Sequence, residues 1–290
     1  VAPQRRPPRR AATAAGDTFV PRSPMPAVGA LSLPGFPQVD GVDDFAGVAF
    51  HTARWQDGID LAGKRIGVVG TGATGVQVIQ EVAKVAGQLT VFQRHANWCA
   101  PLGNRAITPD EQAEIKTTQR ELLERCAQTY GGFLHDAERL KTTEVTADER
   151  EAFWERRYRE PGFGIWFGNY RDVMVDEAAN ALLGDFIARK IRERVYDPKT
   201  ADLLTPKNHG FGTRRVPLES GYYEVYNQPN VELVDISTTP IERVTARGIR
   251  TTDRHTDLAL MVWATGFDAA TAAFHAVDVT GVHGCPRRAG

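Results

Sequence analysis

The chain has 290 residues, of which 42% are hydrophobic and 24% are charged, and its formal net charge at pH 7 is -1. This length and hydrophobic content are enough to bury the core of one large domain or two small ones. The near-zero charge gives no reason to expect binding to nucleic acid or to a membrane surface, and no apolar run approaches the roughly 20 residues that span a bilayer. We therefore expect a soluble cytoplasmic protein.

The first 30 residues differ from the rest of the chain. Residues 1–30 are rich in Pro, Ala and Arg and show no apolar periodicity, which is typical of a disordered tail. The pairs Arg5-Arg6 and Arg9-Arg10 are not followed by the apolar segment that a targeting signal needs. We therefore predict a disordered or non-homologous tail.

No metal site or redox pair is predicted. Cys99, Cys126 and Cys285 are too far apart for a Cys-x-x-Cys motif, and their number is odd. The seven histidines have neither the His-x-x-x-His nor the His-Glu-x-x-His spacing of metal enzymes. The cysteines are expected to be ordinary reduced thiols.

A glycine-rich motif lies between the apolar, strand-like run 65–69 and a predicted helix over residues 76–86. Its residues are Gly70, Thr71, Gly72, Ala73, Thr74 and Gly75. In such motifs the first glycine permits a tight turn, the second lets the backbone approach a diphosphate, and the third lets helix and strand pack closely. Because unpaired N–H groups and the positive end of the helix dipole meet there, we expect dinucleotide binding, with Gln77 as a further contact.

The end of the next predicted strand, residues 89–93, indicates which dinucleotide binds. NAD sites place an Asp or Glu about 20 residues after the first glycine, where it binds the ribose 2′-hydroxyl. This chain has Arg94 and His95 there instead. A guanidinium suits the 2′-phosphate of NADP, because it can form two charge-assisted hydrogen bonds with phosphate. We therefore predict an NADP site; the alternative is that Arg94 is an ordinary surface arginine.

A second pattern, Phe-x-Gly-x-x-x-His-x-x-x-Trp, precedes the glycine motif. Its residues are Phe45, Gly47, His51 and Trp55. It resembles the fingerprint of type I Baeyer–Villiger monooxygenases, which are flavoproteins that use FAD, NADPH and dioxygen. Related N-hydroxylating and flavin-containing monooxygenases carry a similar pattern without the tryptophan. The resemblance implies that His51 acts at a domain junction and not in proton transfer, and that Phe45, His51 and Trp55 lie on an exposed face towards a FAD domain.

Two later segments extend the resemblance. Residues 210–217 read Gly-Phe-Gly-Thr-Arg-Arg-Val-Pro and resemble the family's Gly-Thr-Lys-Arg-x-Pro segment, whose Arg stabilises the peroxyflavin anion. That makes Arg215 the catalytic candidate, since a fixed cation stabilises nearby negative charge. Arg214 replaces the family's usual Lys as a cofactor contact. Residues 264–268, Ala-Thr-Gly-Phe-Asp, resemble the turn that returns to the FAD domain, and they add Thr265 and Gly266 to the cofactor-binding set.

The middle of the chain, residues 108–195, has a helical pattern. Thr108, Pro109 and Glu111 form a predicted cap that leads into a helix over residues 112–130. Apolar residues at spacings of three and four from Val175 to Ile191 predict a second helix with one packed face.

Aromatic clusters at residues 153–154 and 163–167 could line a substrate pocket, but we interpret them as core packing. Residues 230–235 and 258–263 and a hairpin across residues 246–248 are strand-like.

The predicted fold class is α/β, with a Rossmann-like NADP-binding domain interrupted by a helical insertion and without the family's N-terminal FAD-binding unit. The resemblance begins near Leu31 and ends near Gly284. The predicted parts are the tail (1–30), the linker with the fingerprint and the first half of the NADP-binding domain (31–105), the helical insertion (106–199), the second half of the NADP-binding domain (200–266) and a truncated return towards the FAD domain (267–290).

The resemblance implies oxidation of a ketone to an ester or lactone with O2, with NADP(H) and FAD as cofactors and a separately encoded FAD domain as a candidate partner. Two alternatives remain open. The chain could be a non-catalytic NADP-binding remnant, or a relative of the N-hydroxylating and flavin-containing monooxygenases. A flavin-dependent reductase fits less well, because the chain has neither a Cys-x-x-Cys motif nor a second nucleotide fingerprint.

Overall fold

The computed structural model describes residues 11–20, 25, 27 and 29–269. The chain divides into two compact units, residues 1–35 with 267–290 and residues 36–266. In the first unit, β1 (Ala11–Ala12) and β2 (Thr18–Phe19) form a short antiparallel pair within the segment predicted to be a tail. In the same unit, Pro34 and Phe267 form an antiparallel bridge.

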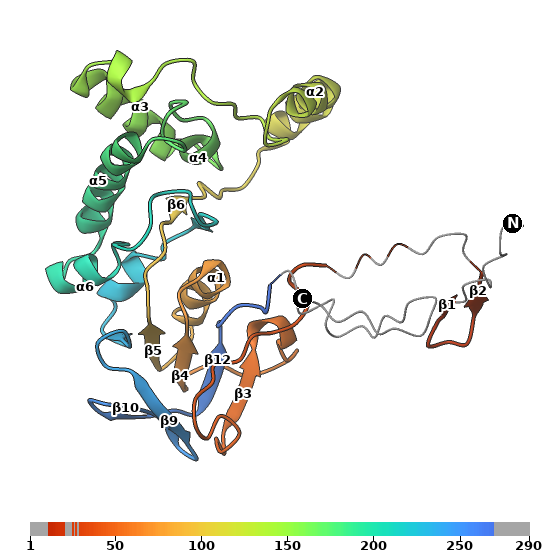
Figure 1. The fold of residues 1–290 in the computed structure, drawn as a ribbon, viewed down its shortest axis with the longest axis vertical. Coiled ribbons are helices and arrows are strands. Elements are labelled where there is room, and N and C mark those ends of the chain that lie inside the picture. Colours follow the sequence, from red (N-terminus) through yellow and green to blue (C-terminus); the bar gives the residue numbers. More distant parts are fainter. Residues whose placement is uncertain (1–10, 21–24, 26, 28, 270–290) are drawn as a thin grey trace, which may run out of the picture. The chain divides into compact units, whose positions relative to one another are not determined.

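The second unit is built on a five-stranded sheet with the order β3-β12-β4-β5-β8, in which every neighbouring pair runs parallel (Figure 1). The strands are β3 (Val48–His51), β12 (Leu260–Trp263), β4 (Arg65–Val69), β5 (Gln88–Gln93) and β8 (Val231–Asp235). The three central strands are buried along nearly their whole length. Burial on both faces explains why their sequences are continuous apolar runs instead of alternating ones.

The strand order gives this sheet a reversal point. From β4 the chain moves outwards on one side to β5 and β8, and it returns to the other side of β4 as β12. In open parallel sheets, ligands bind at the carboxyl edge where the order reverses in this way. The predicted α/β class with a parallel sheet is therefore confirmed, and its expected ligand crevice lies between the ends of β4 and β12.

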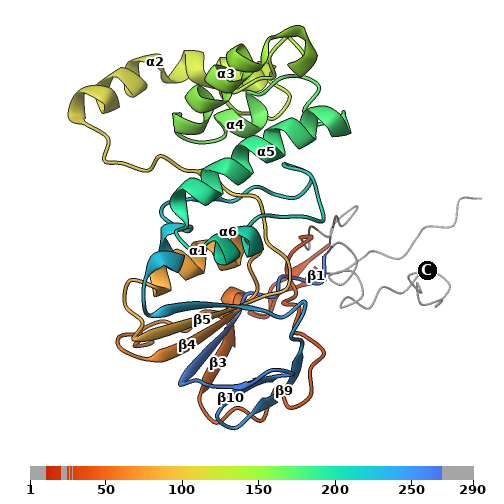
Figure 2. The ribbon, with the colours of Figure 1, turned by 90° about the vertical axis from the view of Figure 1, so that its left-hand side faces the viewer.

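The sheet lies between two different layers (Figure 2). Helices α1 (Ala73–Val82) and α6 (Pro198–Leu203) cover one face. The other face is covered by an antiparallel sheet of β9 (Ile241–Thr245), β10 (Gly248–Thr251) and β11 (His255–Asp257). The predicted hairpin connects β9 to β10. The buried apolar side chains accordingly form two clusters, one for each face of the parallel sheet.

Along the chain, a group of helices lies between β6 (Ala100–Pro101) and β7 (Leu218–Glu219). These two short strands pair in parallel and form a small sheet of their own. These helices are α2 (Pro109–Gln128), α3 (Ala147–Arg159), α4 (Gly164–Phe167) and α5 (Glu177–Arg194), followed by α6. The short 3-10 helices are η1 (Thr52–Arg54), η2 (Thr142–Glu144) and η3 (Glu224–Asn227). The predicted cap is present: the Thr108 side chain accepts from the Glu111 backbone, and the Glu111 side chain accepts from the Thr108 backbone.

Helix α5 buries one face, but two residues of the predicted stripe do not belong to it. Leu183, Phe186 and Ile191 are fully buried, whereas Val175 is 85% exposed and Leu182 is 38% exposed. Val175 precedes the helix, which begins at Glu177 because Asp176 accepts a hydrogen bond from the Ala179 backbone and caps it. The helix ends at Arg194, within the segment to residue 195 that the sequence pattern predicted to be helical.

Arg194, in the last turn of α5, connects the helical segment to β7. Its guanidinium donates two hydrogen bonds to the buried carboxylate of Glu219, at 2.7 and 3.0 Å, and also pairs with Glu224. Buried charges that are paired and hydrogen-bonded in this way are costly to break. The ion pairs therefore hold the end of α5 against the segment that begins at β7.

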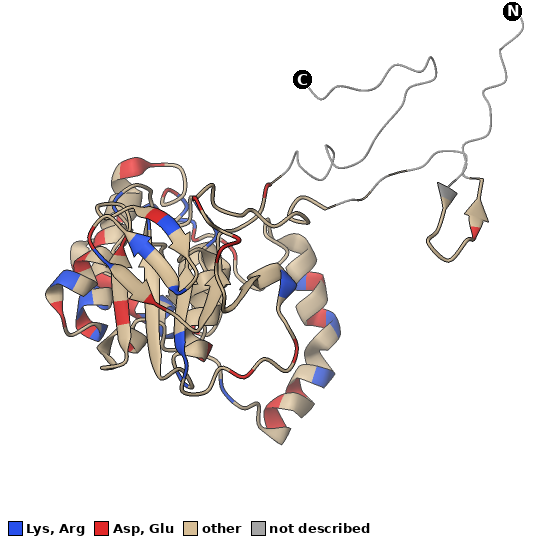
Figure 3. Ribbon diagram, turned by 90° about the horizontal axis from the view of Figure 1, so that it is seen from below, with Lys and Arg blue, Asp and Glu red and all other residues tan. Residues whose placement is uncertain are grey.

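In the view of Figure 3, basic and acidic residues are interspersed along the described ribbon. Among the described residues, no helix is long and apolar enough to cross a membrane, and no group of three or more His, Cys, Asp or Glu could hold a metal ion. Cys99 and Cys126 are free thiols, and burial raises the pKa of Cys99 well above its usual range. Cys285 lies outside the described residues.

Candidate functional site

The predicted site residues follow the carboxyl ends of adjacent parallel strands. The glycine motif follows β4, Arg94 and His95 follow β5, and Thr265 and Gly266 lie just beyond β12. His51 is the last residue of β3. Carboxyl ends of parallel strands share one edge of a sheet, so the fold gathers these segments at the edge where α/β folds bind ligands.

The glycine motif forms a tight turn that only glycine allows at two positions. Gly70 has a φ of +106°, and a Cβ there would lie 2.5 Å from the Ala264 carbonyl oxygen at the end of β12. At Gly75, in the first turn of α1, a Cβ would lie 2.2 Å from the Gly70 carbonyl oxygen. Glycine at these two positions therefore allows the turn, the helix and the end of β12 to pack closely on one another.

Gly72 differs from the other two glycines of the motif. A Cβ at Gly72 would meet no atom within 4 Å, so this side of the turn is open. Gly72 is the N-cap of α1, no side chain caps the helix, and its first turn contains no acidic residue. The first backbone N–H groups of a helix need partners from outside it. An anion at this position would find those donors and the positive end of the helix dipole.

Thr71 ties this turn to the end of β5. Its side chain is 3% exposed, and its hydroxyl donates a hydrogen bond to the backbone carbonyl oxygen of His95, at 2.9 Å. Arg94 and His95 themselves are exposed. Within the described part of the chain, Arg94 makes no hydrogen bond or ion pair, which leaves its guanidinium available to a ligand.

The loop of residues 209–217 runs beside the segment that follows β5. Asn97 donates to the Arg215 carbonyl oxygen at 3.2 Å, and the Trp98 indole donates to the His209 carbonyl oxygen at 2.9 Å. Further along, the Ala100 backbone donates to the Pro217 carbonyl oxygen at 3.1 Å. Two segments separated by more than 100 residues are thereby joined, and the loop is fixed next to the end of β5.

This pairing brings positive charge together. Arg214 and Arg215 are both exposed. Burial lowers the pKa of His209 below its usual range, and the nearby positive charges of Arg214 and His95 lower it further. The loop cation Arg214 and the strand-end residue His95 therefore both act electrostatically on one imidazole. A multiply charged anion near this loop would be attracted by the exposed guanidinium groups of Arg214 and Arg215.

The fingerprint residues are only partly where we expected them. Trp55 is 39% exposed and packs edge-on against Phe50, with ring centroids 4.8 Å apart. His51, however, is 1% exposed, so its predicted place on an exposed face is wrong. Its Nδ1 accepts from the Ala53 backbone and caps η1.

The surroundings of His51 explain its burial. The His51 ring packs edge-on against Phe36, with ring centroids 5.5 Å apart. Burial lowers the pKa of His51, a backbone hydrogen bond with Gly266 acts in the opposite direction, and the charge of Arg54 lowers the pKa again. The fingerprint histidine is thus a buried link between β3 and the segment after β12.

The ring of Phe45 packs directly against the backbone of Gly47. A Cβ at Gly47 would lie 2.6 Å from the Phe45 ring and 2.7 Å from the Ala259 carbonyl oxygen. Phe45 is partly buried and packs on the cluster beneath the sheet. These two residues of the fingerprint therefore serve local packing in this unit.

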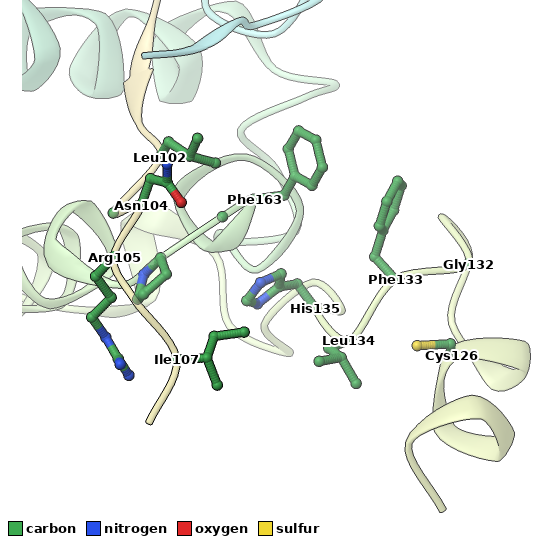
Figure 4. Close-up of a pocket in the computed structure, with 13 residues that line it drawn as sticks. Leu102, Asn104, Arg105, Ile107, Cys126, Gly132, Phe133, Leu134, His135 and Phe163 are labelled. Atoms are coloured by element: carbon green, nitrogen blue, oxygen red, sulfur yellow. The ribbon is translucent and has the colours of Figure 1, made fainter. Parts of the chain in front are cut away.

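A separate hollow lies among the helices that interrupt the sheet (Figure 4). It is lined by residues from the segment after β6, from the end of α2 and the loop beyond it, and from the α3–α4 turn, including Leu102, Ile107, Phe133, His135 and Phe163. No residue of the predicted cofactor or catalytic set lines it. Of the two aromatic clusters, Phe153 and Trp154 are buried as expected, whereas Phe163 borders this hollow.

The contacts of three residues that shape the site were not predicted from the sequence. Hydrogen bonds between segments far apart in the chain are donated by the Thr71 hydroxyl and the Asn97 side chain and accepted by the His209 carbonyl oxygen. Only Thr71 lay inside a predicted motif, and its hydroxyl had no assigned role there.

Comparison with known proteins agrees with this architecture. Residues 23–108 match the model of the flavin-binding monooxygenase-like family. The chain is 45% identical to 2-oxo-Delta(3)-4,5,5-trimethylcyclopentenylacetyl-CoA monooxygenase of Pseudomonas putida, over 88% of this chain and 48% of that protein. It is 40% identical to cyclopentanone 1,2-monooxygenase of a Comamonas species, over 84% of this chain and 45% of that protein. It is 38% identical to a phenazine N-monooxygenase of Lysobacter antibioticus, over 93% and 50% respectively.

Solved structures give the same result. The crystal structure of OTEMO with FAD and NADP superposes with a TM-score of 0.87 at 44% identity, covering 90% of this chain and 50% of that one. The open crystal structure of cyclohexanone monooxygenase superposes with a TM-score of 0.89 at 39% identity, covering 96% and 54%. The chain spans about half the length of the relatives it matches, and over that half it is homologous to the type I Baeyer–Villiger monooxygenases of the flavin-binding monooxygenase-like family.

Proposed function

We propose that this chain is the NADP-binding part of a flavin-dependent Baeyer–Villiger monooxygenase, which oxidises a ketone to an ester or lactone with NADPH and O2. One observation carries the proposal. The glycine turn after β4, the segment after β5 that carries Arg94 and the Arg214-Arg215 loop are joined by hydrogen bonds at one edge of the sheet. Each of these segments offers donors or positive charge to an anionic cofactor.

The residues at this edge fit NADP. Gly72 leaves the N-terminus of α1 open to a diphosphate, which the first backbone N–H groups of the helix would bind. Arg94 would bind the 2′-phosphate, and Arg214 would add positive charge near it. Thr74 and Gln77 lie in α1, and Thr265 and Gly266 follow β12, so both groups are candidates for further contacts with the nucleotide.

FAD does not have an equivalent place among the described residues. In the family's chemistry, reduced FAD activates dioxygen for transfer to the substrate. The described part of the chain has one glycine-rich turn between a strand and a helix, and we assign it to NADP. We therefore propose that a FAD domain joins this unit to form the complete enzyme, and the absorbance spectrum of the purified chain tests whether it retains flavin alone.

Arg215 is the residue of this chain that we assign to the chemistry. Its side chain is exposed, while its backbone carbonyl oxygen is held by Asn97. A guanidinium keeps its charge at any working pH, so it can stabilise negative charge on the oxygen that is transferred. Its role as a catalytic group rests on the resemblance of residues 210–217 to the family segment.

The experiment is to join the chain to the FAD-binding portion of the Pseudomonas putida relative and to compare Arg215→Ala with Arg215→Lys. We expect Arg215→Ala to continue oxidising NADPH while ester formation falls by at least about 100-fold, the effect of removing one preorganised stabilising group. Arg215→Lys should retain part of the product, because it keeps a cation. Arg120→Ala is the matched control, since Arg120 is 90% exposed on α2. Unchanged ester formation by Arg215→Ala would remove Arg215 from the mechanism.

The substrate panel of the same experiment separates the alternatives. The match to a phenazine N-monooxygenase favours N-oxygenation as a second candidate, so an aromatic N-heterocycle should be offered beside cyclic ketones. An N-oxide without any ester would replace the ketone assignment. NADP binding with no oxygenation of either substrate would identify a nucleotide-binding remnant.

A further inference from the structure

One side chain of the helical segment, Asn180, hydrogen-bonds to both backbone groups of Phe211 in the loop that carries Arg214 and Arg215. The Asn180 Oδ1 accepts a hydrogen bond from the Phe211 backbone N–H at 2.9 Å, and its Nδ2 donates to the Phe211 carbonyl oxygen at 2.8 Å. The same Nδ2 donates to the Val173 carbonyl oxygen at 2.9 Å. The amide of Asn180 therefore pairs with Phe211 as a neighbouring strand would, and both backbone groups of Phe211 are used.

The residues on both sides of Phe211 are glycines because the helical segment lies so close. A Cβ at Gly210 would lie 2.3 Å from the Asn180 Oδ1. Gly212 has a φ of +79°, and a Cβ there would lie 2.7 Å from the Trp166 indole nitrogen and 2.9 Å from the Met174 sulfur. Side chains at either position would push the loop away from α4 and α5.

Phe211 anchors the base of the loop, and the arginines lie at its tip. The Phe211 side chain is fully buried and packs on Trp98, with ring centroids 6.2 Å apart. Residues 213–215 are exposed. Phe211 lies three residues before Arg214, and the Thr213 hydroxyl between them donates to the Gly210 carbonyl oxygen at 2.9 Å. We therefore expect a shift of the loop base at residues 210–211 to alter where the guanidinium groups lie.

We propose that Asn180 is a positioning residue for Arg214 and Arg215, and that through it the helical segment sets the place of both cations at the sheet edge. The proposal rests on the proposed function, which gives the two arginines their ligands. Asn180 touches neither the nucleotide nor the reacting atoms, and it acts through the backbone of Phe211. It lies in the first turn of α5, where no sequence motif marks it.

The first test measures how freely the loop opens. Trypsin cleaves after arginine, so the cleavage rate at Arg214 and Arg215, followed by mass spectrometry under native conditions, reports local opening. Asn180→Ala should accelerate this cleavage by about tenfold, the effect of losing one net hydrogen bond. The matched control is Asn227→Ala, because Asn227 bridges the Arg194 carbonyl oxygen and the Tyr196 backbone N–H in the same manner at 2.7 and 2.9 Å. Equal acceleration by both variants, or none by Asn180→Ala, would overturn the proposal.

The second test is a double-mutant cycle that a general loss of stability cannot imitate. Gly210→Ala alone should accelerate the same cleavage, because its methyl group would strike the Asn180 amide. In the Asn180→Ala background that atom is gone, so Gly210→Ala should add less than about twofold. Fully additive effects would show that the two residues do not act on each other and would contradict the proposal.

The third test links the loop to ligand binding and separates this inference from the proposed function. Asn180→Ala should weaken NADP binding by about threefold to tenfold through misplacement of Arg214, while NAD binding stays unchanged. Unchanged NADP binding despite faster cleavage would show that the loop does not position a nucleotide contact. If the three tests succeed but the Arg215→Ala fusion still forms ester, only the catalytic role of Arg215 is lost.

Discussion

The hydroxyl of Thr71 donates a hydrogen bond to the backbone carbonyl oxygen of His95, at 2.9 Å. This bond connects the middle of the glycine turn to the end of the neighbouring strand, and its donor is 3% exposed. The two segments that would bind the diphosphate and the 2′-phosphate of one nucleotide are thereby held at a fixed separation. Their geometry is set before any ligand arrives, which reduces the ordering cost of binding.

Replacing Thr71 tests that connection. Thr71→Val keeps the shape of the side chain but leaves the His95 carbonyl oxygen without this donor, so the free energy of unfolding should fall by about 1 kcal/mol. NADP binding should weaken as well. Thr117→Val is the control, because the Thr117 hydroxyl donates to the Glu114 carbonyl oxygen on exposed helix α2. Chemical denaturation and nucleotide titration of both variants would show whether the loss is specific to Thr71.

Gly75→Ala should mainly reduce the stability of the fold, whereas Gly72→Ala should mainly reduce the affinity for NADP. At Gly75 the added methyl group would lie 2.2 Å from the Gly70 carbonyl oxygen, and we expect a stability loss of about 1–3 kcal/mol. At Gly72 it would meet nothing within 4 Å, so the chain should fold with a loss below about 1 kcal/mol. If the diphosphate lies against Gly72, however, NADP affinity should fall by at least about tenfold. Normal NADP binding by Gly72→Ala would move the diphosphate away from this turn.

Arg94→Ala tests the choice between cofactors. Removal of a charged hydrogen bond should weaken NADP binding by about 1.5–3 kcal/mol, or about 10-fold to 150-fold, and leave NAD binding nearly unchanged. Arg120→Ala again serves as the control for a lost surface charge. Equal losses for the two nucleotides would show that Arg94 does not contact the 2′-phosphate.

Three histidines give the fold a dependence on pH. Burial is the main cause that lowers the pKa of His51, His135 and His209 below the ordinary value of 6.5. The unfolded chain therefore binds more protons than the folded chain just below pH 6.5, and stability must fall as the pH falls through that value. Denaturation at about pH 7.5 and about pH 5.5 should show a lower free energy of unfolding at the acidic pH. His209→Gln should reduce the difference, and an unaltered difference would mean that His209 does not contribute.

Local signals allowed much of the fold to be predicted. The capping residues Thr108 and Glu111 gave the start of α2, and the hairpin between β9 and β10 was expected from residues 246–248. The glycine motif lies between a strand and a helix as predicted, although α1 begins three residues earlier and ends four residues earlier than expected. Caps, turns and periodicity act within a few residues, so they can be read from the sequence.

Contacts between distant segments could not be predicted. Nothing near His51 in the sequence indicates that its ring is buried and packs against Phe36. The pairing of Asn180 with Phe211 and the bond from Trp98 to His209 cross 31 and 111 residues of sequence. Such contacts depend on how the helical segment packs on the sheet, for which the sequence carries no local pattern.

The most direct test of the account is a calorimetric titration of the purified chain with NADP and, separately, with NAD. We predict one NADP site per chain with an affinity at least about tenfold higher than that for NAD, because only NADP offers a 2′-phosphate to Arg94. The heat should vanish for NADP when Gly72→Ala and Arg94→Ala are combined. Equal affinity for the two nucleotides, or no binding of NADP, would contradict the assignment of this sheet edge to NADP.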